Sequence, residues 1–278
     1  MSKNVLTRSV THRNLGIKIG LFWILTPFTM LSTADSSGSN VSNRWFQAIS
    51  DSTITVLFDE TKPISYSTAY WNIRGLGAPL RMMLCAAKLN HVVHMYDLVE
   101  DGEHGWKSGY FVEKETKFIP DYTPFMNLPC FADEHEKIVI TQLNACLYYV
   151  GNICGMMGQT PLEQTTCVQY LCEIYDLRTV MTNHVYDGKG TSQSVIESGK
   201  GHLAKFESLL KNKEKKCFTV GDSISAPDFH LFEMIDQYDA LQKSIDQTAD
   251  MLTDLPNVRT FFDEFSKLEY VQNSRVFA

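Results

Sequence analysis

Apolar and polar positions alternate in two different ways along the chain. Residues 64–71 follow a strand-like pattern that ends at a glycine turn over residues 74–77. Apolar residues then recur at helical spacing over residues 80–87, and residues 91–98 form a second strand candidate. This part of the chain is therefore expected to begin as a βαβ unit.

The same unit is expected to continue to about residue 154. Residues 102–121 are polar, aromatic and glycine-containing, which predicts a long loop. Residues 130–132 and 137–140 are short apolar runs on either side of a polar turn, a pattern typical of a hairpin. A helix is expected over residues 142–152.

Beyond residue 158 the pattern is helical throughout. Thr160-Pro-Leu-Glu163 combines a hydroxyl cap, a proline in the first turn and an acid three places on, which marks the start of a helix. Ser225-Ala-Pro-Asp228 repeats this arrangement, and Pro256 is expected to open the last long helix. The predicted fold is an α/β domain over residues 64–154 followed by an all-α helical domain over residues 158–278.

The N-terminal residues 1–34 have the order of a targeting segment. Four basic residues precede an apolar run over residues 19–31, and small residues follow. A secretory signal peptide fits this order best, a membrane anchor comes second, and an organelle-targeting leader comes third. The run is shorter than the roughly 20 residues that span a bilayer, so stable membrane insertion is not expected. Residues 35–63 are expected to form a linker, in which residues 53–58 are either a strand or an apolar tail.

Composition narrows the class of function. The chain has 278 residues, 44% of them hydrophobic and 21% charged, which is ordinary for a folded globular protein. Its net charge of -7 argues against nucleic-acid binding, which needs a surplus of Lys and Arg. The seven cysteines form no CxxC pair, so neither a zinc ribbon nor a dithiol redox motif is expected. An odd count in a chain of this size is typical of reduced core cysteines.

Several short motifs occur in one order along the chain. They are Tyr70-Trp-Asn-Ile-Arg-Gly-Leu76, Asn127-Leu-Pro129, Thr141-Gln-Leu-Asn-Ala145, Ser225-Ala-Pro-Asp-Phe229 and Leu255-Pro-Asn-Val258. Together they resemble the motifs of cytosolic glutathione transferases of the mu-like class, over about three quarters of the chain. The resemblance implies a thioredoxin-like N-terminal domain, glutathione as co-substrate, no metal, and a homodimer.

By this resemblance Tyr70 is the catalytic residue. The thiolate of glutathione is the nucleophile, and a free thiol has a pKa near 8.5, so a donor aimed at sulfur must favour the charged form. A tyrosine hydroxyl fixed at the end of a strand suits that task. Tyr66 is the alternative if the motif is misaligned.

The resemblance also implies a set of glutathione-binding residues. These are Trp71, Leu76, Trp106, Lys117, Asn127, Leu128, Pro129, Gln142, Leu143 and, from the partner subunit, Asp176. Leu128-Pro129 resembles the cis-proline turn that presents a backbone edge to the cysteinyl part of glutathione. Gln142 is expected to bind the γ-glutamyl carboxylate at a helix start. Tyr186 is expected at the electrophile site.

Three positions depart from the family pattern. Leu143 stands where a serine hydroxyl is usual, which removes a charge-assisted hydrogen bond worth about 1.5–3 kcal/mol. The basic side chains that meet the glycyl carboxylate fall, without gaps, on Glu103 and Tyr110. Lys107, Lys114 and Lys117 lie in the same stretch, and Lys117 is the expected substitute.

The expected function is conjugation of the glutathione thiolate to apolar electrophiles, a detoxification reaction. Two alternatives stay open: an isomerase or peroxidase of the same fold, and a non-catalytic binding or structural relative, which Leu143 favours. The compartment is also open. Glutathione is abundant in reducing compartments, so an organelle leader would agree with it better than a secretory signal. Without a targeting segment the protein is expected to be cytoplasmic.

Overall fold

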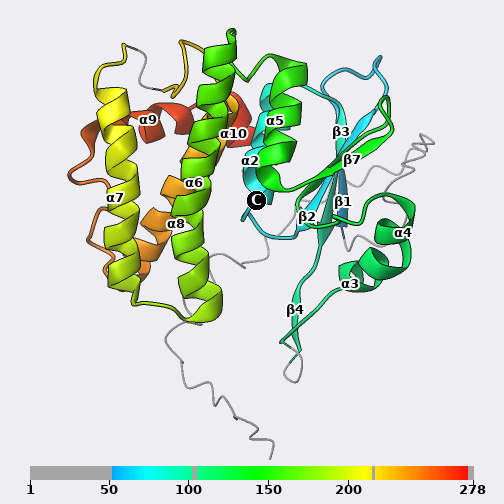
Figure 1. The fold of residues 1–278 in the computed structure, drawn as a ribbon, viewed down its shortest axis with the longest axis horizontal. Helices are drawn as coiled ribbons and strands as arrows, with labels where there is room; N and C mark the ends of the chain where they lie inside the picture. The colour runs from blue at the N-terminus through cyan, green and yellow to red at the C-terminus, as the bar shows by residue number, and fades with distance from the viewer. Residues whose placement is uncertain (1–51, 102–104, 215–216, 275–278) are drawn as a thin grey trace, which may run out of the picture.

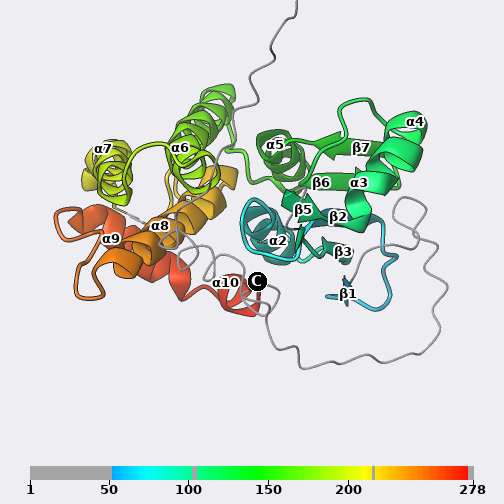
Figure 2. The same ribbon diagram turned by 90° about the horizontal axis from the view of Figure 1, so that it is seen from below.

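The computed structural model describes residues 52–101, 105–214 and 217–274. The predicted targeting segment, residues 1–34, lies outside this range, as does most of the predicted linker. Within the described range, an α/β unit lies beside an all-helical unit (Figures 1 and 2). This order confirms the predicted fold class.

The α/β unit is built on a mixed five-stranded sheet with the order β1-β3-β2-β6-β7. Its strands are β1 (Ser52–Val56), β2 (Tyr66–Trp71), β3 (His91–Tyr96), β6 (Cys130–Asp133) and β7 (Ile138–Thr141). β2 and β3 are parallel, as the βαβ pattern predicts, and the other neighbouring pairs are antiparallel. The predicted hairpin is confirmed as β6 and β7. A separate two-stranded ribbon consists of β4 (Val99–Asp101) and β5 (Gly105–Lys107).

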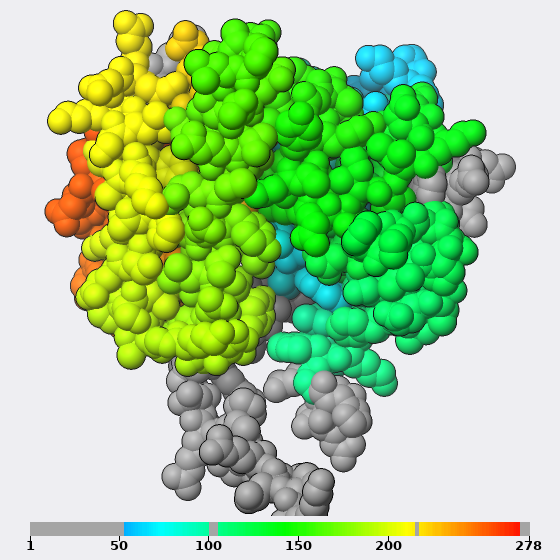
Figure 3. All heavy atoms as spheres, in the orientation of Figure 1, coloured from blue at the N-terminus to red at the C-terminus, as the bar shows by residue number. Residues whose placement is uncertain are grey.

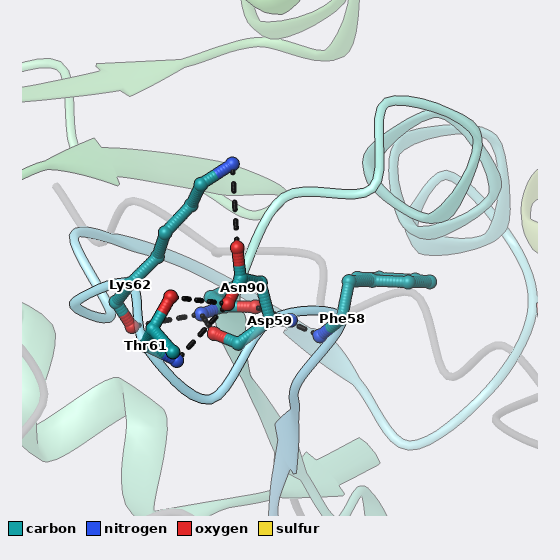
Figure 4. Close-up of polar contacts among 5 residues, drawn as sticks. All are labelled: Phe58, Asp59, Thr61, Lys62 and Asn90. Atoms are coloured by element: carbon teal, nitrogen blue, oxygen red, sulfur yellow. Dashed lines mark hydrogen bonds and ion pairs between the residues drawn. The ribbon is translucent and has the colours of Figure 1, made fainter.

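Of residues 53–58, which the sequence left open between a strand and an apolar tail, 53–56 belong to strand β1. All five residues of β1 pair with β3 at one edge of the sheet. The segment that follows β1 is hydrogen-bonded to the buried side chain of Asn90, which lies just before β3 (Figure 4). The Asn90 carbonyl oxygen accepts from the backbone N–H groups of Phe58 and Asp59, at 2.8 and 3.1 Å. Its amide nitrogen donates to the carbonyl oxygens of Asp59 and Lys62, at 2.6 and 2.9 Å. One side chain therefore holds the connection between β1 and β2 in place.

The prediction of a long loop over residues 102–121 is wrong for most of that stretch. After β5 the chain forms three consecutive helical segments, α3 (Gly109–Glu113), the π-helix η1 (Lys114–Phe118) and α4 (Ile119–Asp121). The Ser108 hydroxyl caps the first of them. The physical reason is tertiary packing. Tyr110 and Phe118 are buried, and the Tyr110 ring lies 5.2 Å from the ring of Trp71 in an edge-on arrangement.

Two helices of the α/β unit, α2 (Gly77–Ala86) and α5 (Leu143–Cys154), lie on the face of the sheet toward the helical unit. The helical unit consists of α6 (Pro161–Asp187), α7 (Ser192–Lys211), α8 (Ala226–Ile245), α9 (Pro256–Ser266) and α10 (Glu269–Ser274). No helix in the described ranges is long and apolar enough to cross a membrane.

The predicted helix starts are confirmed. Thr160 and Glu163 form a reciprocal capping box at α6, and Ser225 and Asp228 form another at α8. The buried Asp228 carboxylate also accepts from the backbone N–H and the hydroxyl of Thr219, at 2.7 and 2.6 Å. The two hydrogen bonds from Thr219 therefore hold the loop before α8 against the first turn of that helix.

An ion-pair cluster joins the two units. Arg74, in the turn after β2, lies 2.7 Å from the buried Glu233 carboxylate and also pairs with Asp236, both on α8. Arg74 therefore has a structural role, because it links the two units. The cluster fixes the turn after β2 against the helical unit, which is where the candidate site lies.

Candidate functional site

A cavity of about 370 Å³ opens between the two units. Its walls are the end of β2 with the following turn, the β4–β5 ribbon, the loop before β6, and α6. Figure 3 shows this hollow between α6 and the β4–β5 ribbon. The predicted site residues that line it are Tyr70, Trp71, Leu76, Trp106, Asn127, Leu128 and Tyr186. Residues more than 100 positions apart in the sequence therefore meet at one place.

Tyr70 is the most rigidly placed of these residues. Its side chain is only 6% exposed, and its ring lies directly against the turn that follows β2. A Cβ atom added at Gly75 would lie 2.8 Å from the Tyr70 hydroxyl oxygen, and one at Gly77 would lie 2.7 Å from the ring. Gly75 also has a φ of +39°, which side chains other than glycine rarely adopt. The two glycines therefore provide the space in which the Tyr70 ring is held.

The electrostatic surroundings keep Tyr70 a neutral phenol. Burial raises its pKa, and the Tyr186 hydroxyl adds to that rise. The backbone N–H of Leu76 and the charges of Arg178 and Arg81 act in the opposite direction. A tyrosine whose pKa is above 10 carries its proton at neutral pH, so it can donate a hydrogen bond to an anion in the cavity.

The loop before β6 brings a backbone edge to the cavity. The Leu128–Pro129 peptide bond is cis, as the motif predicts, and Leu128 and the exposed Asn127 line the cavity. Pro129 is buried behind them. Trp106 reaches the cavity from β5 and is 37% exposed.

The predicted γ-glutamyl site lies at the start of α5, outside the cavity lining. Gln142 is exposed and occupies the N-cap position with a φ of +72°. Leu143 is 2% exposed, and its side chain belongs to the hydrophobic core. The prediction that Leu143 contacts glutathione can therefore apply only to its backbone, because its side chain points away from any ligand.

Lys117 does not line the cavity. Its ammonium group lies 5.7 Å from the centre of the Phe118 ring, and its charge adds to the lowering of the pKa of His94, which burial mainly causes. Lys107 and Lys114 are not part of the lining either. None of the three lysines therefore lines the cavity beside Trp106.

Asp176 is exposed on α6 and does not line the cavity of its own chain. Its proposed reach into the site of a partner subunit stays a prediction. Tyr66, the alternative to Tyr70, is also outside the lining, and its ring stacks on Phe131 at 5.8 Å. The register of the motif is therefore the one in which Tyr70 faces the cavity.

Sequence reasoning missed Arg178, which lines the cavity from α6. A signal was present in the spacing. Tyr175, Arg178, Val185 and Tyr186 follow one another at intervals of three, seven and one residues, which places them on one face of a helix. The sequence did not show which other element this face of the helix packs against.

No group of three His, Cys, Asp or Glu side chains in the described ranges is arranged to hold a metal ion. All seven cysteines lie within those ranges, and none of them forms a disulfide bond. The lining of the cavity offers hydroxyl, amide, guanidinium and aromatic groups. Such a set can bind a polar, partly anionic molecule beside an apolar one.

Known proteins resemble this chain over most of the described range. Residues 175–273 match the family model described as Glutathione S-transferase, C-terminal domain. The chain is 30% identical over 176 residues to the Glutathione S-transferase of Dirofilaria immitis. This match covers 62% of this chain and 76% of that relative. It is 27% identical over 204 residues to Glutathione S-transferase Mu 3 of Homo sapiens, covering 73% and 84% respectively.

Among solved structures, the Onchocerca volvulus Pi-class glutathione S-transferase is similar with a TM-score of 0.58 at 23% identity. The match covers 76% of this chain and 91% of that structure. At this level of identity the likeness shows a shared fold.

Proposed function

Because the chain belongs to the glutathione S-transferase family, we propose that it binds glutathione beside Tyr70 and transfers the thiolate to an electrophile. The observation that carries this proposal is the Tyr70 hydroxyl, buried, protonated and fixed by Gly75 and Gly77 at the wall of a cavity. A fixed donor stabilises a thiolate without reorganising, which is the main way such sites lower a pKa.

The remaining lining residues support an orientation for glutathione. The Leu128 backbone beside the cis bond would pair with the cysteinyl part as an added strand would. Trp106 would contact the glycyl end, and the exposed backbone N–H groups at the start of α5 would meet the γ-glutamyl carboxylate. In that orientation the sulfur lies at Tyr70, and α6 with Tyr186 faces the second substrate.

The test is a calorimetric titration of glutathione into the full chain, with Tyr70→Phe and Tyr66→Phe variants. All three proteins should bind glutathione. Conjugation of 1-chloro-2,4-dinitrobenzene and the thiolate absorbance should fall about a hundredfold in Tyr70→Phe alone, because one preorganised donor is lost. No binding at millimolar glutathione would make the non-catalytic alternative the better one. Binding without conjugation would lead to the isomerase and peroxidase alternatives.

The mu-like class is part of the proposal. It is supported by the motif from Tyr70 to Leu76 and by the likeness to Mu 3 enzymes over about three quarters of the chain. Nematode relatives without a class in their names reach similar identity. A crystal structure with glutathione would test the class feature directly, since the mu-like proposal requires Trp106 against the glycyl carboxylate.

We also propose a homodimer. Phe125, which precedes the loop of Asn127 and Leu128, is 77% exposed. Such exposure of a phenylalanine next to a binding loop favours a partner, and a second copy would also bring Asp176 to the site. Sedimentation equilibrium should give a dimer for the full chain and a monomer for Phe125→Ser. Val112→Ser, which changes another exposed apolar residue, on α3 and 66% exposed, should stay dimeric.

For the compartment, we propose a reducing one. Seven cysteines that form no disulfide bond and a glutathione-dependent reaction favour it over the secretory path. Residues 1–34 would then act as an organelle leader. Fusing residues 1–51 to a fluorescent protein tests this, and secretion of the fusion would contradict it.

A further inference from the structure

Arg178 differs from the other arginines of the described ranges in having no partner for its guanidinium. Arg74 pairs with Glu233 and Asp236, and Arg259 pairs with Asp250. Arg81 is buried and donates to the carbonyl oxygen of Ile73 at 3.0 Å. Arg178 makes no hydrogen bond or ion pair through its side chain within the part of the chain that the structure describes. Its charge is therefore available to a ligand.

The guanidinium is nevertheless held in position. Its central carbon lies 5.9 Å from the centre of the Tyr175 ring, within the range of a cation–π contact. Both residues line the cavity, together with Val185 and Tyr186 of the same helix. A ring contact supports the group without neutralising it, so the positive charge persists at the cavity wall.

The positive charge of Arg178 acts to lower the pKa values of two groups on other elements, and these groups show which part of the cavity the charge reaches. Arg178 opposes part of the rise in the pKa of Tyr70, on β2. It also adds to the lowering of the pKa of His230, a buried residue of α8, although burial is the larger cause. The guanidinium thus lies within electrostatic reach of the Tyr70 hydroxyl, on the α6 side of the cavity. This is the side assigned above to the second substrate.

We propose that Arg178 binds a carboxylate of the second substrate, so that the preferred electrophiles are anionic molecules with an apolar body. This inference rests on the proposed function and replaces the expectation of a purely apolar electrophile. A guanidinium matches a carboxylate with two parallel N–H···O bonds, and a wall of low dielectric strengthens them. Ile73 and Leu76 across the cavity suit the apolar body.

Glutathione's own carboxylates fit Arg178 less well. The orientation proposed above directs one of them to the start of α5 and the other to Trp106, both on elements of the α/β unit. Arg178 belongs to α6, beside Tyr186. A carboxylate that it binds therefore comes from the molecule that receives the thiolate.

A matched pair of electrophiles tests the proposal: 4-chloro-3,5-dinitrobenzoate and its methyl ester. In both, the glutathione thiolate attacks the ring carbon that bears chlorine, a C–S bond forms, and chloride leaves with the C–Cl electron pair. The thiol proton goes to solvent. The two electrophiles differ in the carboxylate charge, so the ratio of their kcat/KM values reports recognition of the anion.

The full chain is compared with Arg178→Gln and with Arg259→Gln, which removes an equal charge from the surface. We expect Arg178→Gln to lower kcat/KM for the benzoate by about ten- to a hundredfold, mainly through KM, because a charge-assisted bond pair is lost. The ester should change less than threefold, and Arg259→Gln should change neither. Arg178→Lys should restore part of the benzoate activity.

Equal losses for benzoate and ester would overturn the proposal, since Arg178 would then act on the thiolate through Tyr70. An unchanged benzoate reaction would overturn it as well. A binding measurement separates this result from the proposed function: 3,5-dinitrobenzoate lacks chlorine and does not react. Its calorimetric Kd should weaken at least tenfold in Arg178→Gln even if the chain conjugates nothing, whereas an unchanged Kd contradicts the proposal.

Discussion

The Tyr70 hydroxyl and Gly75 lie so close together that a Cβ atom at position 75 would be 2.8 Å from the phenolic oxygen. The turn after β2 and the candidate catalytic side chain therefore form one packed unit. Any side chain at position 75 must displace the hydroxyl or the turn.

This contact predicts that Gly75→Ala lowers both activity and stability. The positive φ and the close contact together should cost more than about 1 kcal/mol, and the shifted hydroxyl should reduce kcat. Gly201→Ala is the matched control, because a Cβ there on α7 meets nothing within 4 Å. That variant should be neutral or stabilised by up to about 1 kcal/mol in urea unfolding. Full activity in Gly75→Ala would show that the Tyr70 position does not depend on the turn.

The ion pair of Arg74 with Glu233 should be important for stability. The Glu233 side chain is 1% exposed, so removal of its cationic partner leaves a buried carboxylate. We expect Arg74→Ala to lower the free energy of unfolding by about 3–5 kcal/mol. The double variant Arg74→Ala, Glu233→Leu should regain part of this loss. Breaking the exposed pair of Arg259 and Asp250 should cost less than about 1 kcal/mol, and equal costs for both pairs would contradict the prediction.

Asn90 should determine whether β1 stays on the sheet. Asn90→Ala removes four part-buried hydrogen bonds to the chain between β1 and β2. The expected loss is about 1–3 kcal/mol, with faster hydrogen exchange of the β1 amides. Asn152→Ala, which removes one exposed bond to Tyr148, serves as the control. Unchanged exchange in β1 would mean that its pairing with β3 suffices.

Three buried histidines predict a loss of stability in mild acid. Burial lowers the pKa of His91 and His94 to about 4 and that of His230 to about 3, against 6.5 in an unfolded chain. Between these values the unfolded chain binds more protons, so stability is full above pH 6.5 and falls as the pH drops toward 4. Three such groups give a slope of up to about 4 kcal/mol per pH unit near pH 5.

Replacing one histidine should reduce that slope. Neither ring nitrogen of His230 has a hydrogen-bond partner within the described part of the chain, so His230→Leu should be nearly neutral at pH 7.5. Near pH 5 it should reduce the slope by about one proton, or about 1.4 kcal/mol per pH unit, in urea unfolding. His135→Gln, at an exposed site, should leave the slope unchanged. An unaltered slope in His230→Leu would mean that other groups cause the acid sensitivity.

Short sequence patterns were sufficient to predict several local features of the fold. The capping boxes at Thr160 and Ser225, the glycine turn after Tyr70 and the alternation in the hairpin involve residues within a few positions of each other. Their geometry depends on nearby backbone, so sequence alone was sufficient to predict them. The cis bond before Pro129 was expected from the resemblance of its motif to the family's cis-proline turn.

Other features were decided only when distant segments met. The helical segments from Gly109 to Asp121 depend on packing of the Tyr110 ring against Trp71, Tyr96 and Phe118, which a polar local pattern concealed. Arg178 became a site residue because one face of α6 meets the end of β2.

The sequence by itself therefore determined the order of elements, the helix starts and the place of Tyr70 at the end of a strand. Tertiary structure decided which side chains share a cavity and that Leu143 turns into the core. It also decided that the guanidinium of Arg178 has no hydrogen-bond or ion-pair partner among the residues that the structure describes. The physical reason is that burial and charge pairing are properties of three-dimensional neighbours, and residue spacing along the chain does not specify these neighbours.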